Sequence, residues 1–290
     1  MIKAIKDLLK YDRSFLLGFI LLMFILFISV LSFFSPYNPQ ERYVVSRDRP
    51  PSFKHILGTN SLGQDVFWYL TFATRNSLII GLLAVILGRF VAIIIGLLSG
   101  YLGGYFDNFI TTITDSFIVL PRLPILILLS FIIKGKMNFI SMAVLIAFFD
   151  WAWPSKRYRS QILSLKELEF TNTARFSGRN TIQIIFKEHI PFLVPYILAD
   201  SISGFLFAIG MEITLSVLGL TNLDIPTIGT SIFWANYYQS MLNGTWWWIS
   251  SPIVILIITV LSFYLLSVSI GTYLDPRVRL QKLSAEGGNK

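Results

Sequence analysis

Apolar segments of roughly membrane-spanning length dominate this chain of 290 residues, 54% of which are hydrophobic. A helix needs about 20 predominantly apolar residues to cross the hydrocarbon core of a bilayer. Six segments come near this length: Ser14–Phe34, Ser77–Gly100, Phe109–Ile133, Phe139–Trp153, Phe192–Leu220 and Ile249–Tyr273. Because the bilayer core has no water to bond the backbone, each segment must satisfy its own backbone as a helix. The sequence therefore predicts an all-α, polytopic membrane protein with six transmembrane helices.

Two prolines predict a kink in the third segment, because Pro121 and Pro124 each lack an amide donor. Six crossings would place both termini on one side of the membrane, and the distribution of Lys and Arg indicates which. Fifteen basic residues fall in the N-terminal segment, the connection between the fourth and fifth segments and the C-terminal tail, against seven on the other side. Both termini are therefore predicted to be cytoplasmic, in a cell membrane.

This orientation divides the chain into three parts. Residues 1–72 would hold an N-terminal cytoplasmic segment, the first transmembrane helix and an external loop. Residues 73–273 would form the transmembrane domain, with a cytoplasmic loop at 156–190, and residues 274–290 a cytoplasmic tail. In the external loop, Thr59, Asn60 or Ser61 could cap a short helix that lies on the membrane and leads into the second span.

The sequence lacks the common motifs that enzymes use for nucleotide binding, metal binding or nucleophilic catalysis. The chain has no cysteine and two histidines, so thiolate or histidine metal sites are not expected. It contains no Walker-type glycine loop and no H-E-x-x-H or G-x-S-x-G motif. The net charge of +8 is divided among loops between apolar runs, which argues against a nucleic-acid-binding domain. We expect no catalytic residues and no cofactor in this chain.

Two acidic residues in the fifth apolar segment are costly in lipid and need a reason. Asp200 and Glu212 are twelve residues apart, which is just over three helical turns, so they share roughly one face of the helix. That face could pack against other helices or line a pathway, and the sequence does not decide between these readings. An ion-coupled carrier would also use such acids, although six spans without an evident inverted repeat are few for one.

The polar connection between the fourth and fifth segments is long for a loop inside a compact membrane protein, which suggests a function. Asn172 to Phe176 can form a helical turn that Gly178 closes in a left-handed conformation. Thr173 and Ala174 are small enough to allow a close approach by another protein. Arg175 and Arg179 offer forked donors to its carboxylates. We interpret this connection as a docking site.

Four stretches of the sequence, in order, resemble the second inner-membrane permease of the dipeptide, oligopeptide and nickel branch of binding-protein-dependent ABC importers. The family's cytoplasmic loop reads Glu-Ala-Ala, three residues, Gly, nine residues, then Ile-x-Leu-Pro. Asn172-Thr173-Ala174, Gly178 and Ile190-Pro191 have those spacings here. The other three stretches are Leu57–Asp65, Glu212–Leu220 and Leu274–Arg277. The chain departs from the pattern at Asn172, Thr173, Glu188 and Gln64, and the first two alter the docking face.

The resemblance implies a type I ABC importer permease fold. Two different permeases would surround one translocation path, two ATPase subunits would bind ATP and Mg²⁺, and an external binding protein would deliver the solute. The residues implied to contact an ATPase are Glu169, Thr173, Ala174, Arg175 and Gly178. Peptides dominate the branch, with oligosaccharides, or less readily nickel, as alternatives. Trp246–Trp248 could form an interfacial belt or contact such a solute.

Overall fold

The computed structural model describes residues 2–133 and 137–274, and regular structure within them is almost entirely helical. The longer helices are α2 (Arg13–Leu31), α3 (Val66–Leu102), α4 (Gly104–Val119), α5 (Arg122–Ile133), α6 (Phe139–Asp150), α7 (Ala152–Lys166), α10 (Ile190–Val217) and α12 (Trp246–Leu274). Shorter helices are α1 (Ile2–Tyr11), η1 (Ser32–Phe34), α8 (Glu169–Phe176), α9 (Thr181–Ile184), the π-helical turn η3 (Ile185–His189) and α11 (Ile228–Tyr237). The predicted all-α class is confirmed for this part of the chain. The predicted tail 274–290 and the Leu274–Arg277 motif fall outside it, except for Leu274.

Four described helical stretches are long and apolar enough to cross a membrane: Arg13–Phe34, Val66–Leu102, Thr181–Val217 and Trp246–Tyr273. Helices α4 and α5 pass the same test only as a pair, bent by 81° at their junction. The predicted kink is therefore confirmed. Leu120 adopts the extended conformation that a following proline favours (φ −60°, ψ 132°). The chain is thus a polytopic membrane protein whose described residues hold four candidate spans, or five if the bent pair is one, and α6 is a shorter apolar helix.

The second span begins eleven residues earlier than predicted, at Val66. Asp65 is its N-cap, and the Asp65 side chain accepts a hydrogen bond from the Trp68 amide at 3.1 Å. Asn60 instead accepts from the amides of Leu62 and Gln64 in the preceding turn. The predicted cap at Thr59, Asn60 or Ser61 and the separate surface helix were therefore wrong: one continuous helix runs from Val66 to Leu102.

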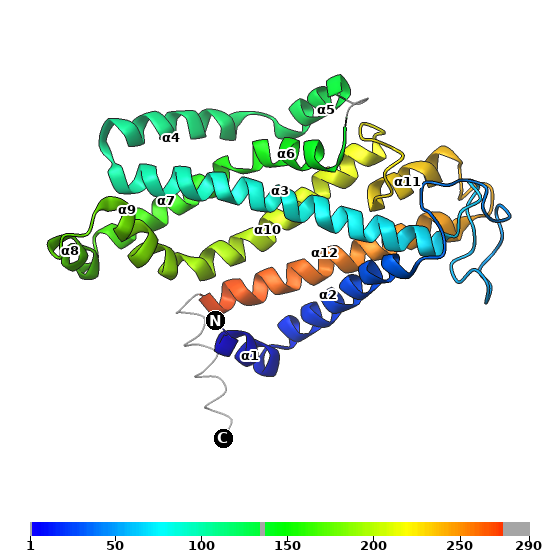
Figure 1. The fold of residues 1–290 in the computed structure, drawn as a ribbon, viewed down its shortest axis with the longest axis horizontal. Coiled ribbons are helices and arrows are strands. Elements are labelled where there is room, and N and C mark those ends of the chain that lie inside the picture. Colours follow the sequence, from blue (N-terminus) through cyan, green and yellow to red (C-terminus); the bar gives the residue numbers. More distant parts are fainter. Residues whose placement is uncertain (1, 134–136, 275–290) are drawn as a thin grey trace.

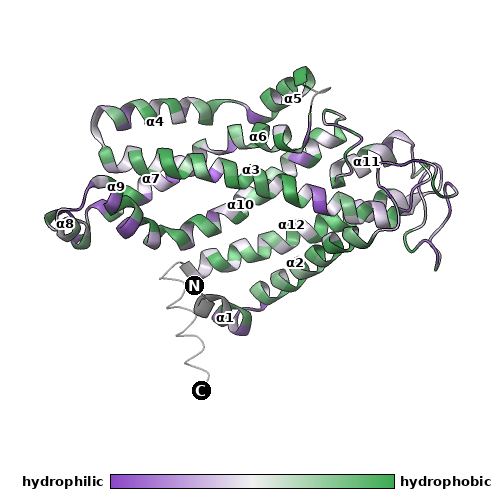
Figure 2. Cartoon of the chain, in the orientation of Figure 1, coloured by the Kyte–Doolittle hydropathy of each residue, from purple (hydrophilic) through white to green (hydrophobic). Residues whose placement is uncertain are grey.

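Successive long helices run back and forth along the molecule, with α3 near the centre (Figure 1). Helices α8 and α9 lie at one end, and α11 lies at the opposite end with the loop of residues 35–65 (Figure 1). The long helices are mostly hydrophobic, whereas the polar residues gather toward the two ends (Figure 2). This distribution is the one expected of a protein whose long axis crosses a bilayer.

Close packing of α3 against α7 depends on two glycines in α3. A Cβ atom on Gly96 would collide with the Ser155 carbonyl oxygen, and one on Gly100 would lie 2.8 Å from the Arg159 carbonyl oxygen. The sequence spacing of these glycines is typical of helix–helix contacts in membranes, and here it holds α7 against α3.

The aromatic residues at the start of α12 do not form a single belt. Trp247 and Trp248 are buried with Leu62, Val66 and Ala235, and the Trp247 indole donates to the Thr59 carbonyl at 3.1 Å. Only Trp246 is largely exposed, at 57%. The belt interpretation was wrong for Trp247 and Trp248, because consecutive helical residues point in different directions and the loop before α3 covers two of them.

Candidate coupling helix and buried charge network

Helix α8, with the turn that follows it, projects at one end of the molecule (Figure 1). The backbone turns sharply after it at Gly178, whose φ of +76° is left-handed, as predicted from the sequence. The Arg179 amide then donates to the Ala174 carbonyl at 3.3 Å. This is the helix end that a glycine at this position favours.

One side of α8 is anchored to the rest of the chain through Thr171 and His189. The buried Thr171 hydroxyl donates to the Leu165 carbonyl at 2.8 Å and lies 2.8 Å from Nε2 of His189. Because the hydroxyl has a single proton, Nε2 of His189 is the donor in the second bond. Phe170 stacks on Phe192, with ring centroids 5.0 Å apart. The contacts of Thr171 and His189 were not predicted from the sequence, because neither of these two residues belongs to the loop motif.

Ala174 faces this anchored side, contrary to the role predicted for it. It is 7% exposed and packs in a cluster with residues of α3, α7 and α10. Its small side chain therefore allows α8 to lie close to its own helices rather than to a partner. The other predicted contact residues, Glu169, Thr173, Arg175 and Gly178, are exposed.

Exposed apolar side chains accompany these polar residues on α8, α9 and the π-helical turn. Phe176 is 91% exposed, Ile182 62% and Phe186 61%. Isolated exposed apolar residues are common, but three within eleven positions beside a projecting helix are typical of a protein contact surface. We call Glu169, Thr173, Arg175, Phe176 and Ile182 the α8 surface. Sequence reasoning missed the two apolar members because burial cannot be read from a short helix.

Arg179 contributes less to the α8 surface than predicted, because it forms an ion pair with Glu188 in the same chain. Glu188 is one of the departures from the family pattern described above, so this ion pair depends on a residue in which the chain differs from that pattern. Arg175 is the arginine of this loop that the structure leaves exposed as a forked donor on α8.

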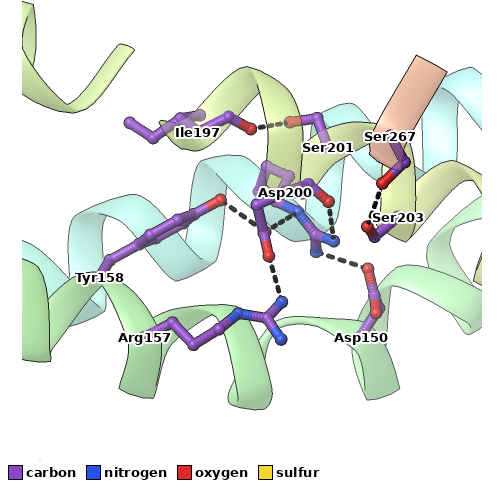
Figure 3. A network of polar contacts seen from close by, with 9 residues as sticks. Asp150, Arg157, Tyr158, Ile197, Asp200, Ser201, Ser203 and Ser267 are labelled. Atoms are coloured by element: carbon purple, nitrogen blue, oxygen red, sulfur yellow. Dashed lines mark hydrogen bonds and ion pairs between the residues drawn. The ribbon is translucent and has the colours of Figure 1, made fainter. Parts of the chain in front are cut away.

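A buried network of charges joins α3, α6, α7 and α10 (Figure 3). Arg89 of α3 lies at its centre: Nη1 donates to Asp150 of α6 at 2.6 Å, and Nε lies 2.7 Å from Asp200 of α10. Arg157 and Tyr158 of α7 bind the two carboxylate oxygens of Asp200, and the Tyr158 hydroxyl donates at 2.8 Å. Arg89, Asp150 and Asp200 are each at least 92% buried.

This network links α7, which leads directly into α8, to the bundle. The hydrogen bond from the Tyr158 hydroxyl to Asp200 is one of the contacts that hold α7 to α10. The charges are paired, as buried charges in a membrane protein must be. We call Arg89, Asp150, Arg157, Tyr158 and Asp200 the charge network.

A second set of contacts fastens α4 to α7. Arg159 donates to both carboxylate oxygens of Asp107 at 2.5 Å, and Lys156 pairs with Asp115 at 2.7 Å. This two-point contact between a guanidinium and a carboxylate is of the stronger, charge-assisted kind. Helix α7 is thus bound to helices on both of its sides.

Glu212 lies in a different environment from Asp200, although both belong to α10. It is fully buried and accepts hydrogen bonds from Ser77 of α3 and from Ser216, both at 2.9 Å. Both acids therefore make packing contacts inside the chain, and they belong to separate networks. Among the described residues no group of three or more His, Cys, Asp or Glu could hold a metal ion.

Comparison with known proteins agrees with this architecture. Residues 92–280 match the family described as the binding-protein-dependent transport system inner membrane component. The chain belongs to this family. The matched region contains α8, its anchors and most of the charge network. The family consists of permeases and not of the ATPases that drive them, so this permease is not itself an enzyme.

Curated relatives cover nearly the whole permease. It is 28% identical to the dipeptide transport system permease protein DppC of Bacillus subtilis, over 93% of this chain and 84% of the relative. It is also 28% identical to the oligopeptide transport system permease protein OppC of Lactococcus lactis subsp. cremoris, over 89% of each chain. The OppC protein of Mycobacterium tuberculosis is 27% identical over 84% of this chain and 83% of its own length. A permease of this family works with ATPase subunits and a solute-binding protein.

Proposed function

We propose that this permease forms half of the translocation path of an ATP-driven peptide importer, and that an ATPase subunit drives it through the α8 surface. The observation that carries the proposal is the two-sided character of α8. One side is fixed to the bundle by Thr171, Ala174 and His189, while the other presents Arg175 and Phe176 to solvent. A helix anchored in this way moves with the bundle when a partner pushes on it.

The path of that motion follows the contacts of α7. Helix α8 follows α7 after two residues, and α7 is bound to α10 through Asp200 and to α4 through Asp107. Since Arg89 also holds α3 and α6 to Asp200, a displacement of α8 reaches four long helices through charged contacts. Coupling by a contiguous network of this kind requires a test by mutation.

Six crossings with both termini in the cytoplasm are the topology that fits this proposal. Helix α6 has 12 residues, about 18 Å of helix against roughly 30 Å of hydrocarbon. The start of α7 continues in the same direction and would complete the crossing (Figure 1). The α8 surface then lies on the side with the excess of Lys and Arg, which favours the cytoplasm.

Peptides are the cargo that the relatives support, because the DppC and OppC proteins described above are named for dipeptide or oligopeptide transport. The path itself would be completed by a second, homologous permease, and an external binding protein would select the peptide. ATP and Mg²⁺ would bind to the ATPase subunits, so this chain would need no cofactor.

Reconstitution tests the proposed activity. The permease, its second permease, the ATPases and the binding protein are placed in vesicles, and uptake of a labelled peptide pool is measured with and without ATP. We expect uptake that requires ATP and every subunit, and that unlabelled peptides inhibit but oligosaccharides do not. Uptake by this chain alone in a proton gradient would contradict the proposal.

The variant Arg175→Glu tests the docking role separately from the cargo. Reversal of one charge at a protein interface costs several kcal/mol when it places like charges together. We expect ATP-driven uptake to fall with normal amounts of permease in the membrane. Lys187→Glu changes an exposed charge in the same loop outside the α8 surface and serves as the control.

A further inference from the structure

An apolar slot of about 480 Å³ lies between α2, α3 and α12, at the end of the molecule opposite α8. Phe24 and Ile28 of α2 form one wall, and residues of α12 from Trp246 to Ile258 form another. Pro51 and Ile56, from the loop before α3, also line the slot. Neither the coupling role of α8 nor the charge network uses this slot.

The length and direction of the slot match one leaflet of a bilayer. Twelve residues separate Trp246 from Ile258, and they correspond to about 18 Å along the helix. Half of the hydrocarbon core is about 15 Å thick. Because α2 and α12 both cross the membrane, the slot runs parallel to the lipid chains beside it.

The mouth of the slot has the residues of a membrane interface. Trp246 is 57% exposed there, and tryptophan prefers the headgroup level of a bilayer. The turn Ser52–His55, closed by a 2.8 Å bond from the Ser52 amide to the His55 carbonyl, carries Phe53 and Lys54 at its tip. Phe53 is fully exposed. Residues 47–54 contain three basic side chains and one acidic one, so this edge favours an anionic group.

We propose that the slot binds one phospholipid, with an acyl chain between α2 and α12 and an anionic headgroup beside Lys54. The volume of the slot and its length of about 18 Å suit one extended acyl chain, whereas a helix of a partner subunit is about 10 Å across or more. The slot instead falls within the range of small-molecule sites, about 300–1,000 Å³. The bound lipid would fill the space between α2 and the rest of the bundle.

Photochemical labelling tests the acyl chain. The full chain is reconstituted in phosphatidylcholine vesicles that contain some phosphatidylglycerol with a diazirine midway along one acyl chain, and labelled positions are mapped by mass spectrometry. We expect labelling at Phe24, Ile28 and Val254 above that at Phe27, which is 60% exposed on the same helix as Phe24 but does not line the slot. Equal labelling of all exposed positions would show ordinary surrounding lipid and would overturn the proposal.

Two variants separate filling of the slot from a general effect on the helix. Val254 is 52% exposed and lines the slot, so Val254→Trp inserts an indole there. It should lower labelling of Phe24 and Ile28 at least about fivefold. Val260→Trp, at a position 42% exposed on the same helix and outside the slot, should leave that labelling unchanged. Equal effects of the two variants would contradict the proposal, as would a cross-link from a probe at Val254 to a second protein chain in the assembled transporter.

The headgroup is tested by the charge at residue 54. Lys54→Glu should lower the preference for the phosphatidylglycerol probe over a phosphatidylcholine probe by at least about fivefold, the effect of losing one basic residue near an anionic surface. Lys10→Glu makes the same charge change at the other end of the molecule and should not affect labelling of the slot. An unchanged preference in Lys54→Glu would overturn the assignment of the headgroup.

Discussion

Removal of Arg89 should destabilise the permease far more than loss of an ordinary contact between helices. In Arg89→Leu, Asp150 loses the partner 2.6 Å away, whereas Asp200 keeps Arg157 and Tyr158. Asp150 is 5% exposed, so its charge would remain buried and unpaired. Breaking a buried ion pair from one side costs about 3–5 kcal/mol. Neutral hydrogen bonds between membrane helices contribute about 0.6 kcal/mol on average and at most about 1.7.

These magnitudes make a double-mutant cycle decisive. We expect Arg89→Leu to lower the free energy of unfolding by about 3–5 kcal/mol. Arg89→Leu with Asp150→Leu should cost less than the sum of the single variants, because no charge is left unpaired. Reversible unfolding of the purified permease in mixed micelles of increasing SDS content measures each value. A loss below about 1.7 kcal/mol for Arg89→Leu, or additive losses, would refute the interpretation of the network as buried paired charge.

Three further variants test the packing and the docking surface. Gly96→Leu should reduce the amount of folded permease in membranes, because even a Cβ atom there collides with Ser155 of α7. Gly210→Leu serves as the control and should give a normal yield, because no atom lies within 4 Å of its Cβ position. Gly178→Val should raise the free energy of this left-handed turn by about 1–2 kcal/mol and lower peptide uptake. Gly178→Asn should retain more uptake than Gly178→Val, because asparagine tolerates a left-handed φ. Thr171→Val should lower the free energy of unfolding by about 1–3 kcal/mol, since it leaves the buried Nε2 of His189 without its partner. A free energy of unfolding equal to that of the parent chain would contradict the anchoring role of Thr171.

The sequence was sufficient to predict the helical membrane class, the proline bend and the left-handed glycine. These features follow from local chemistry: apolar length, a missing amide donor at Pro121 and the freedom of Gly178. The four-residue spacing of Gly96 and Gly100 is likewise typical of close helix packing, and the structure identifies α7 as the helix they contact. Hydrophobic length alone could not locate the start of α3, because its first turns are covered by the loop before it.

Contacts between distant residues could not be predicted in the same way. Asp200 was identified as an intramembrane acid, but its partners Arg89 and Arg157 are 111 and 43 residues away in the sequence. The buried position of Ala174 and the exposure of Phe176 also depend on how α8 docks on the bundle. A single short helix has no periodicity long enough to reveal which side is buried.

Cross-linking at α8 tests most directly whether an ATPase subunit drives this permease. The chain has no cysteine, so Phe176→Cys in α8 and Leu242→Cys in the loop that follows α11 each introduce one thiol, at positions 91% and 83% exposed. Helices α8 and α11 lie at opposite ends of the molecule (Figure 1). With a short bifunctional maleimide in membranes that contain the whole transporter, we expect Phe176→Cys to link to an ATPase subunit and Leu242→Cys not to. In cells with a permeable outer layer and an intact inner membrane, an impermeant maleimide should reach the thiol at position 242 but not the thiol at position 176. A thiol at position 176 that reacts from outside, or that never links to an ATPase, would contradict the account.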